Sequence, residues 1–392
     1  MALAILVLAT LFYLPLTLLA PVPRTAAVHV SYAAPVTATQ TLSLPTYGDS
    51  AIAAVGYPGL LASGGGSGPL PIASITKIIT ALVVLQKAPL AVGDAGPSIL
   101  FTAADTALMK SYAARDGDVY PIQVGRTMTE RDVLTVALVP SANNYARALA
   151  DWAYGSEANF IPVARAWLVS HGLTSTTLTD CTGLNPQNVS TPTDLIALGK
   201  IALTNPVISA IISTKTTTLP VVGTIKNTNQ LLGTVGIDGI KTGTLKGAGA
   251  SLLFSSRLEL DGHVVTLVGV VLDGPTHPVI DAAIASLVTA AREGFHLVTL
   301  ATKGQRFASY TTAWGKHTTA VATKTVSVVV WGGTAITARV SASSVSPAGK
   351  GVVVGLASFT AGIQRQTVPL QLSTKLDGPD PGWRLGHPGE LL

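Results

Sequence analysis

The sequence predicts a mixed α/β (α+β) fold, in which helices flank an antiparallel sheet and a small all-β module follows. Apolar residues recur at helical spacing in several stretches between residues 78 and 170. Two long runs with a strand pattern, Ala248 to Leu260 and Val264 to Leu272, are joined by Asp261 and Gly262, a two-residue hairpin signal. Beyond Leu300 the chain consists of short, largely β-branched runs separated by turns, which is typical of a β-rich module.

The composition supports folded domains and argues against several classes of function. The chain has 392 residues, 48% hydrophobic and 11% charged, which is enough for packed cores in two domains. The net charge of +5 comes without a long basic run, so no nucleic-acid partner is expected. Cys181 is the single cysteine, which excludes an intramolecular disulfide and a Cys-rich zinc site. The seven histidines show no metal-ligand spacing, so we expect no metal and no cofactor.

Residues 1–23 have the composition of an export or membrane segment. They carry no charged side chain, and Ala2 to Ala20 is almost continuously apolar. About 20 apolar residues can cross a bilayer, so we expect a signal peptide or membrane anchor and an extracytoplasmic, cell-envelope location. Residues 24–48, rich in Ala, Thr, Pro and Ser, are expected to form a linker with little packing power. A first strand is then expected from Ala51 to Tyr57.

Ser74 and Lys77 form an S-x-x-K pattern before the apolar run Ile78 to Leu85, which predicts a buried helix. Residues three apart share a helical face, so the Lys77 amine could take the proton of the Ser74 hydroxyl. Amides at the start of the helix could stabilise an oxyanion at the same place. The alternative for this tetrad alone is a helix-capping serine with an exposed lysine.

A second polar group falls in a bend between two helices. Thr129 precedes a predicted helix over 130–138 that ends before Pro140, so Ser141 and Asn143 lie between this helix and the next. Ser141 could instead merely cap the second helix. A further helix is expected over 159–170. Asp180 and Asp194 are interpreted as a loop residue and a helix-start residue, respectively.

A third group, Lys241, Thr242 and Gly243, leads into the strands of the hairpin, and a helix over 278–293 is expected to return over them. Taken alone, Lys241 could be a solvated charge on an edge strand. In this order, S-x-x-K, S-x-N and K-T-G resemble the signatures of the serine penicillin-binding and β-lactamase superfamily. The flanking residues are similar to those of low-molecular-mass D-alanyl-D-alanine carboxypeptidases, namely Pro71 to Ala73, Leu138 to Asn144, Gly183 to Thr191 and Asp238 to Ile240.

The resemblance covers about residues 45–300. It implies a DD-peptidase-like antiparallel sheet flanked by helices with a helical subdomain, in a serine DD-peptidase catalytic domain at 49–298. A β-rich C-terminal domain would then occupy 299–392. The expected activity is removal of the terminal D-alanine from peptidoglycan stem pentapeptides through an acyl-enzyme on Ser74, as part of cell-wall biogenesis. β-Lactams would acylate the same serine, and residues 1–23 would provide any contact with the membrane.

Each motif residue then has an expected role. Ser74 is the nucleophile, and Lys77 can act as its base only when neutral, although a free lysine has a pKa of about 10.4. Burial and the nearby Lys241 cation would both lower that pKa. The resemblance implies that Ser141 relays a proton to the leaving amine and that Asn143 holds a substrate amide.

The remaining roles concern the strand. Lys241 and Thr242 suit the terminal carboxylate of the substrate, and Gly243 would let a substrate strand approach the backbone. The resemblance also implies an oxyanion hole made by the backbone amides of Ser74 and Thr244. Thr244 departs from the aromatic or His residue often found at this position, which leaves a backbone role possible but changes the pocket rim.

Two other functions fit the motifs less well. A β-lactamase of the class A type would need a glutamate between S-x-N and K-T-G to activate water, and Glu157 is the one Glu in that interval, at the start of a predicted helix. A non-catalytic penicillin-binding or wall-binding protein would act through its β-rich tail, but every nucleophilic position is retained here.

Overall fold

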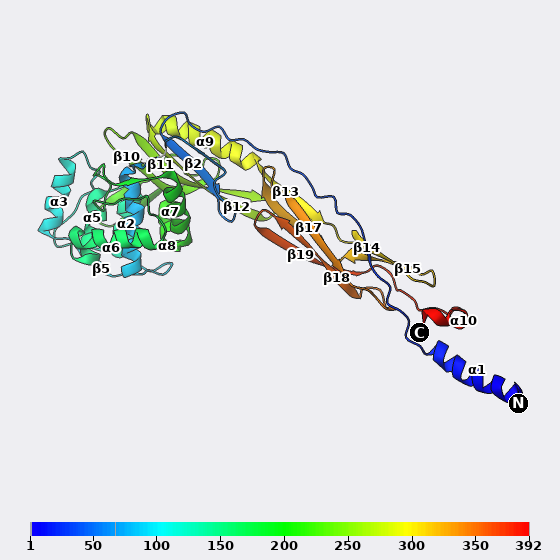
Figure 1. Cartoon of the computed structure of the whole chain (residues 1–392). Coiled ribbons are helices and arrows are strands. Elements are labelled where there is room, and N and C mark those ends of the chain that lie inside the picture. Colours follow the sequence, from blue (N-terminus) through cyan, green and yellow to red (C-terminus); the bar gives the residue numbers. More distant parts are fainter. Residues whose placement is uncertain (1, 67, 392) are drawn as a thin grey trace. The chain divides into compact units, whose positions relative to one another are not determined.

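The computed structural model describes residues 2–66 and 68–391, with side chains from residue 10 onward (Figure 1). Met1, in the predicted export or anchor segment, and Leu392, at the end of the predicted β-rich domain, lie outside the described residues, as does Ser67. The chain divides into two compact units. One comprises residues 41–294, and the other combines residues 1–40 with 295–392.

A five-stranded antiparallel sheet in the order β10-β11-β12-β2-β3 is the centre of the unit at 41–294. The predicted hairpin is confirmed, because Leu260 pairs with His263 across a turn at Asp261 and Gly262. The expected first strand begins two residues earlier and ends at Ala54. The strands are β2 (Asp49–Ala54), β3 (Ala62–Gly64), β10 (Ile237–Thr244), β11 (Ala250–Leu260) and β12 (His263–Gly274).

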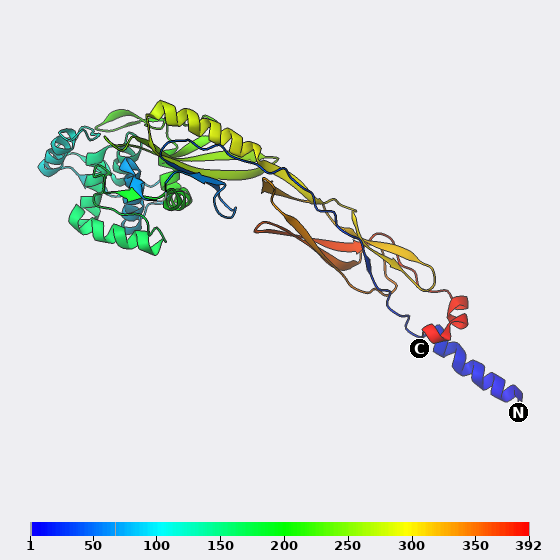
Figure 2. The same cartoon turned by 45° about the horizontal axis from the view of Figure 1, so that its top comes forward.

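Helices α7 (Pro192–Thr204) and α9 (His277–Glu293) pack against this sheet, with α9 lying along it in Figures 1 and 2. The Thr191 hydroxyl caps α7 by accepting a hydrogen bond from the Asp194 amide, as expected of a Thr-Pro helix start. A Cβ at Gly199 would lie 2.7 Å from Val268 Cγ1, so α7 can approach the sheet only with glycine at this position.

The helical subdomain surrounds α2 (Thr76–Lys87), in which every residue from Thr76 to Leu85 is buried. The buried helix predicted over 78–85 is therefore present and starts slightly earlier. Packing of aliphatic side chains on all sides of α2 fixes its position in the core. The other helices here are α3 (Ala103–Ala113), α4 (Glu130–Leu138), α5 (Asn143–Tyr154), α6 (Glu157–Ser170) and α8 (Pro206–Ile212).

Three short antiparallel pairs complete this unit. One of them, β4 with β7, joins the chain just before Ser74 to the chain just before α7. Another pair joins the chain before α3 to the chain before α4. The pairs are β4 (Leu70–Pro71) with β7 (Val189–Ser190), β5 (Ser98–Leu100) with β6 (Thr127–Thr129), and β8 (Thr216–Leu219) with β9 (Gly223–Lys226).

The second unit is built from β strands around its own core, which includes Phe307, Tyr310 and Phe359. A six-stranded sheet has the order β1-β14-β15-β19-β18-β17, and β13 pairs with β16. Residues 295–298, assigned from the sequence to the catalytic domain, belong to β13 of this unit. The strands are β1 (Val28–His29), β13 (Phe295–Ala301), β14 (Arg306–Thr311), β15 (His317–Ala322), β16 (Val326–Trp331), β17 (Ile336–Ala342), β18 (Val353–Ala361) and β19 (Gln364–Leu372).

The segment expected to be a linker with little packing power differs from that expectation over its first part. Val28 and His29 form β1 and pair with β14. The Tyr32 hydroxyl donates a hydrogen bond to the Leu300 carbonyl at 3.0 Å, and its ring centroid lies 5.3 Å from that of Phe359. One β-compatible Val-His pair and one aromatic ring are enough to add this segment to an existing sheet and core.

The N-terminal helix α1 (Ala2–Leu18) contacts the C-terminal helix α10 (Pro381–Gly386), which is followed by a 3₁₀ turn at Pro388–Glu390. Arg384 donates hydrogen bonds to the carbonyl oxygens of Thr17 and Ala20, which satisfies groups left free at the end of α1. Within the described residues, no single helix has both the length and the apolar composition to span a bilayer. The bent pair α7 and α8 meets that test on length and composition together.

Candidate active site

Ser74 lies in a 3₁₀ turn (Ala73–Ile75) that runs directly into α2. The Lys77 ammonium nitrogen is 2.7 Å from the Ser74 hydroxyl oxygen. Ala73, immediately before the serine, has a φ of +46°, a left-handed conformation that a non-glycine residue rarely adopts. The structure thus brings Ser74 and Lys77 into contact at a locally strained turn, as the tetrad predicts for a nucleophile and its base.

Two glycines hold this turn in place. Gly183 has a φ of +86°, and a Cβ added to it would lie 1.8 Å from the Ala73 carbonyl oxygen. A Cβ at Gly243 would lie 2.9 Å from the Ile72 carbonyl oxygen and 3.1 Å from Ala73 Cβ. The missing side chain of Gly243 is therefore required for β10 to pack against the turn, in addition to the substrate approach expected of it.

Ser141 and Asn143 reach the same amine from the bend between α4 and α5. The Lys77 nitrogen lies 3.0 Å from Asn143 Oδ1 and 3.4 Å from the Ser141 hydroxyl. Ser141 has a φ of +69°, so the bend itself is strained at this polar residue. The Asn143 amide donates to the Asp118 carbonyl oxygen at 2.7 Å, which fixes the start of α5.

Burial sets the protonation behaviour of Lys77, whose side chain is 1% exposed. Loss of water around the ammonium group lowers the pKa of Lys77 to about 8, while the carboxylates of Asp118 and Asp180 act in the opposite direction. With this pKa about one amine in ten is neutral at pH 7, and a general base must be neutral to accept a proton. Burial accounts for this shift, whereas the sequence suggested Lys241 as a second cause.

Lys241 is equally buried and lies on β10. Burial lowers the pKa of Lys241 well below its ordinary value, and repulsion by Lys77 adds to that effect. Its amine donates to the Thr242 carbonyl at 3.2 Å and to the Thr242 hydroxyl at 3.3 Å. The Thr242 and Thr228 hydroxyl oxygens are 2.5 Å apart. Lys241 and Thr242 thus form one polar cluster that an incoming carboxylate would complete.

Thr244, at the exposed end of β10, contacts a residue that the sequence did not single out. Its hydroxyl oxygen is 2.7 Å from Nε2 of His277, the first residue of α9. An imidazole therefore lies beside Thr244, at the position where the sequence lacks a large side chain. No local spacing links the two residues, because the contact depends on α9 folding back over the hairpin.

A sequence profile of the D-alanyl-D-alanine carboxypeptidases matches residues 59–276, which is more than half of the chain. The chain belongs to the D-alanyl-D-alanine carboxypeptidase family. It is 30% identical over 240 residues to the D-alanyl-D-alanine carboxypeptidase DacC of Escherichia coli, covering 59% of this chain and 58% of that protein. A D-alanyl-D-alanine endopeptidase of Pseudomonas aeruginosa is 31% identical over 199 residues, which are 48% of this chain and 60% of that one.

Solved structures share the fold of the chain. A DD-transpeptidase from Streptomyces superposes with a TM-score of 0.56 at 27% identity, covering 64% of this chain and 98% of the other. Penicillin binding protein 5 from Haemophilus influenzae gives a TM-score of 0.59 at 19% identity, covering 89% and 100%. The predicted family and fold class are therefore confirmed. The chain spans about three fifths of the length of the curated relatives that it matches.

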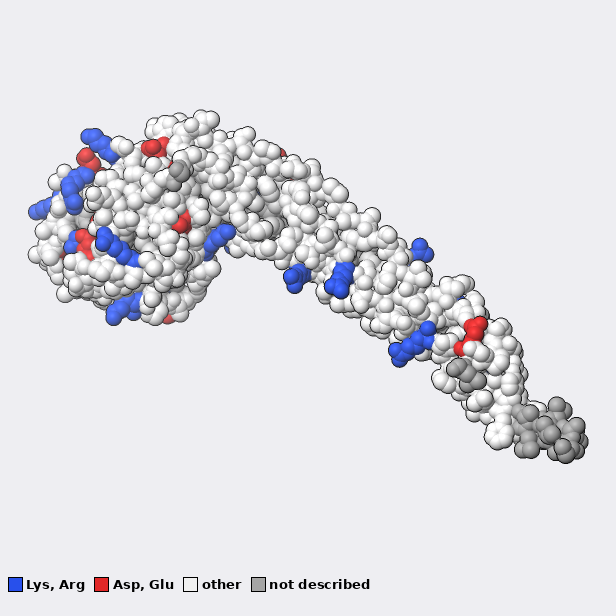
Figure 3. Space-filling model, viewed as in Figure 1, with Lys and Arg blue, Asp and Glu red and all other residues white. Residues whose placement is uncertain are grey.

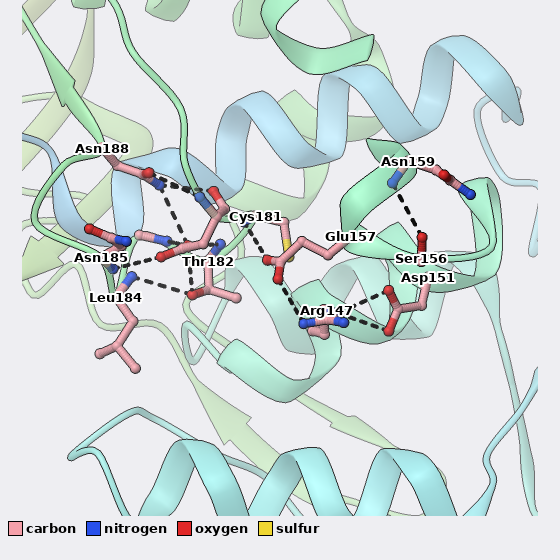
Figure 4. Close-up of polar contacts among 12 residues, drawn as sticks. Arg147, Asp151, Ser156, Glu157, Asn159, Cys181, Thr182, Leu184, Asn185 and Asn188 are labelled. Atoms are coloured by element: carbon pink, nitrogen blue, oxygen red, sulfur yellow. Dashed lines mark hydrogen bonds and ion pairs between the residues drawn. The ribbon is translucent and has the colours of Figure 1, made fainter. Parts of the chain in front are cut away.

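In this member of the D-alanyl-D-alanine carboxypeptidase family, the loop after residue 178 contacts the start of α2 (Figure 4). Both carboxylate oxygens of Asp180 accept backbone amides, at Thr182, Gly183 and Asn185. The Asn188 side-chain amide donates to the Thr76 hydroxyl at 3.1 Å. Asp180 is a loop residue, as expected, and the loop that it organises carries Gly183 against the Ser74 turn.

Glu157 makes contacts that compete with the water-activating role considered for a β-lactamase. One carboxylate oxygen is 2.7 Å from the Arg147 guanidinium, and the other accepts the Cys181 amide at 2.9 Å (Figure 4). Arg147 also binds Asp151. Glu157 therefore links α5, α6 and the 180s loop, a contact network beyond the simple helix-start role expected of it. Cys181 is buried, in line with a structural thiol.

Asp118 is a further charged residue at the site that the sequence did not identify. Its carboxylate raises the pKa of both Lys77 and Lys241, so it lies within electrostatic reach of both amines. It sits in an irregular segment without a motif around it, which left no signal in the sequence. Among the described residues, no group of three or more His, Cys, Asp or Glu side chains is placed to hold a metal ion.

Proposed function

We propose that the protein is a serine-type D-Ala-D-Ala carboxypeptidase that removes the terminal D-alanine of peptidoglycan stem pentapeptides. The observation that carries this proposal is the 2.7 Å contact between Ser74 Oγ and a buried Lys77 amine whose pKa is lowered to about 8. A serine hydroxyl becomes an effective nucleophile only when a base takes its proton, and this amine is placed and tuned to do so.

The positions of these groups support the following acylation step. Ser74 Oγ attacks the carbonyl carbon between the two D-alanines while its proton passes to neutral Lys77. The resulting oxyanion would be held by the backbone amides of Ser74 and Thr244. As the C–N bond breaks, a proton returns from Lys77 through Ser141 to the leaving nitrogen, so that D-alanine departs as a neutral amine and leaves an ester on Ser74. Asn143 would hold an amide of the acyl part.

Substrate orientation comes from β10. Lys241 and the Thr242 hydroxyl would hold the carboxylate of the departing D-alanine. Burial disfavours the ammonium form of Lys241, and the negative charge of the bound carboxylate would stabilise that form, so Lys241 would be protonated when substrate binds. Water then hydrolyses the ester, with Lys77 again accepting a proton. A β-lactam presents a strained amide and a carboxylate to the same groups and would leave a long-lived acyl-enzyme.

We further propose that the protein acts outside the cytoplasm, where this substrate is found, and that residues 1–23 serve export or attach it to the membrane. The uncharged and almost continuously apolar composition of this segment supports that location. Cleavage can be checked by N-terminal sequencing of the protein recovered from cells.

The decisive experiment measures D-alanine release from a defined pentapeptide by wild type and Ser74→Ala. We expect release by wild type and a loss of at least about 10³-fold in Ser74→Ala. Ser286→Ala is the matched control, because Ser286 is an exposed serine on α9 whose hydroxyl contacts only its own helix among the described bonds. Labelling by a fluorescent penicillin that persists in Ser74→Ala would refute the assignment, and rapid antibiotic turnover would favour a β-lactamase instead.

A further inference from the structure

A cavity of about 700 Å³ opens directly beside the proposed reaction centre. Its lining includes Thr244, which follows Gly243, and Leu184, which follows the Gly183 that presses on the Ser74 turn. Asp118 also lines it, and the Asp118 carbonyl is bonded to the Asn143 amide. Three residues that line the cavity therefore neighbour, in sequence or by a hydrogen bond, residues that contact the proposed site. The distance between the cavity and Ser74 is thus fixed by the backbone.

Charged side chains of both signs line this cavity. Asp116 and Asp118 come from the segment after α3, where Arg115 also lies, whereas Lys246 comes from the turn after β10. None of the described ion pairs involves any of these four side chains. Figure 3 shows how few charged side chains the drawn face carries overall. Arg115 Nε donates to the Ser111 carbonyl at 3.2 Å, which holds this side chain against the end of α3. The two carboxylates and Lys246, which have no ion-pair partner among the described residues, suit a ligand that carries both signs itself.

The direction of the substrate places one particular residue in this cavity. With the terminal carboxylate at Lys241 and Thr242, the acyl part of the peptide must extend past Ser74 toward Thr244 and the turn that follows β10. An extended peptide advances about 3.3 Å per residue. The residue immediately before the acyl D-alanine, the third of the stem peptide, is therefore the first whose side chain can enter the cavity.

We propose that the cavity selects a third residue whose side chain ends in both an ammonium and a carboxylate group, as in a diamino dicarboxylic acid. This inference rests on the proposed function. Asp116 and Asp118 bind the ammonium group, and Lys246 binds the carboxylate. A third residue with a single charge satisfies one wall of the cavity, and a neutral one satisfies neither.

The test uses four pentapeptides that differ only at the third residue, which is norleucine, lysine, 2-aminopimelate or meso-diaminopimelate. The kcat/KM of each is divided by that of the norleucine peptide. In wild type we expect the diaminopimelate ratio to be the highest, at roughly tenfold. Asp116→Asn should lower the ratios for lysine and diaminopimelate, and Lys246→Gln those for 2-aminopimelate and diaminopimelate, each by roughly threefold.

Matched controls separate this effect from a change in net charge. Lys110→Gln removes an exposed lysine of α3 outside the cavity lining. Asp261→Asn removes a carboxylate from an exposed residue that, like Asp116, has a positive φ but lies outside the cavity lining. Both should leave all ratios unchanged. Ratios near one in wild type, or a variant that lowers all of them equally, would overturn the inference while leaving the proposed function intact. Failure of wild type to release D-alanine from any of the four peptides would instead refute the proposed function.

Discussion

The unit at 41–294 and the β-rich unit differ in backbone strain and in the polar groups that they bury. Among the described residues, all seven non-glycine positions with positive φ lie in the first unit, including Ala73 and Ser141 at the site. The buried Lys77, Lys241 and Glu130 lie there too, whereas the buried polar residues of the module are threonines such as Thr312 and Thr318. Strained backbone and buried charge therefore occur in the unit for which chemistry is proposed, and the β-rich unit is stabilised by ordinary apolar packing.

The strongest test of this contrast is Lys77→Met, which replaces the buried amine by an apolar chain of similar length. We expect kcat/KM for D-alanine release to fall by at least about 10³-fold, because the base is lost. The midpoint of thermal unfolding should stay the same or rise, since a desolvated amine is removed. A large loss of stability together with the loss of activity would contradict this separation.

The opposite pattern is expected in the module. Phe359→Ala removes a buried ring that packs on Tyr32 and Phe307, and should lower the free energy of unfolding of the module by about 3–5 kcal/mol. Denaturant unfolding followed by circular dichroism measures this loss. D-alanine release below the unfolding transition should be unchanged. Val353→Ala, at an exposed position of β18, is the control and should have little effect.

The pH dependence of the reaction tests the lowered pKa of Lys77. Only the neutral amine can accept the Ser74 proton, so kcat/KM should fall about tenfold per pH unit below an apparent pKa of about 8. Between pH 8 and pH 6 this amounts to about 50-fold, because half of the amine is still neutral at pH 8. Asp118 raises that pKa, so Asp118→Asn should move the acidic limb of the pH profile of kcat/KM to lower pH. A limb that stays in place or moves upward would argue against this electrostatic role.

The smallest effect concerns Glu130, a fully buried carboxyl whose two oxygens have no hydrogen-bond partner among the described residues. Burial raises the pKa of Glu130 to about 7, so stability falls as pH rises from about 4.3 to about 7. Glu130→Gln should therefore increase the free energy of unfolding by about 1–3 kcal/mol at pH 8 and change it little at pH 4. An equal effect at both pH values would show that ionisation is not the cause.

Much of the unit at 41–294 could be predicted because the sequence patterns that indicate its elements are local. The hairpin turn at Asp261 and Gly262, the apolar run that forms α2 and the three ordered motifs are all visible in short windows of sequence. The family and fold class inferred from them agree with the profile match and with the solved structures.

Long-range contacts left no comparable signal. Asp118 and His277 reach the site from segments without motifs, and Tyr32 packs into the module from a stretch that resembled a linker. From the sequence, the absence of a side chain at Gly243 is explained by the approach of the substrate. The structure shows a second reason, because a Cβ at this position would also collide with the turn that carries Ser74. In each case the deciding neighbour is distant in sequence, so propensity and spacing could not reveal it.

The two glycines that press on the Ser74 turn also bear on when the site can form. Gly183 and Gly243 lie far after Ser74 in the chain, and both must be in place before the strained backbone at Ala73 is held. A chain emerging during synthesis would therefore carry its serine for a long time in an ordinary, unreactive conformation. Reactivity would arise only when the sheet closes on the helical subdomain, which couples the last stage of folding of this unit to the first moment of catalysis.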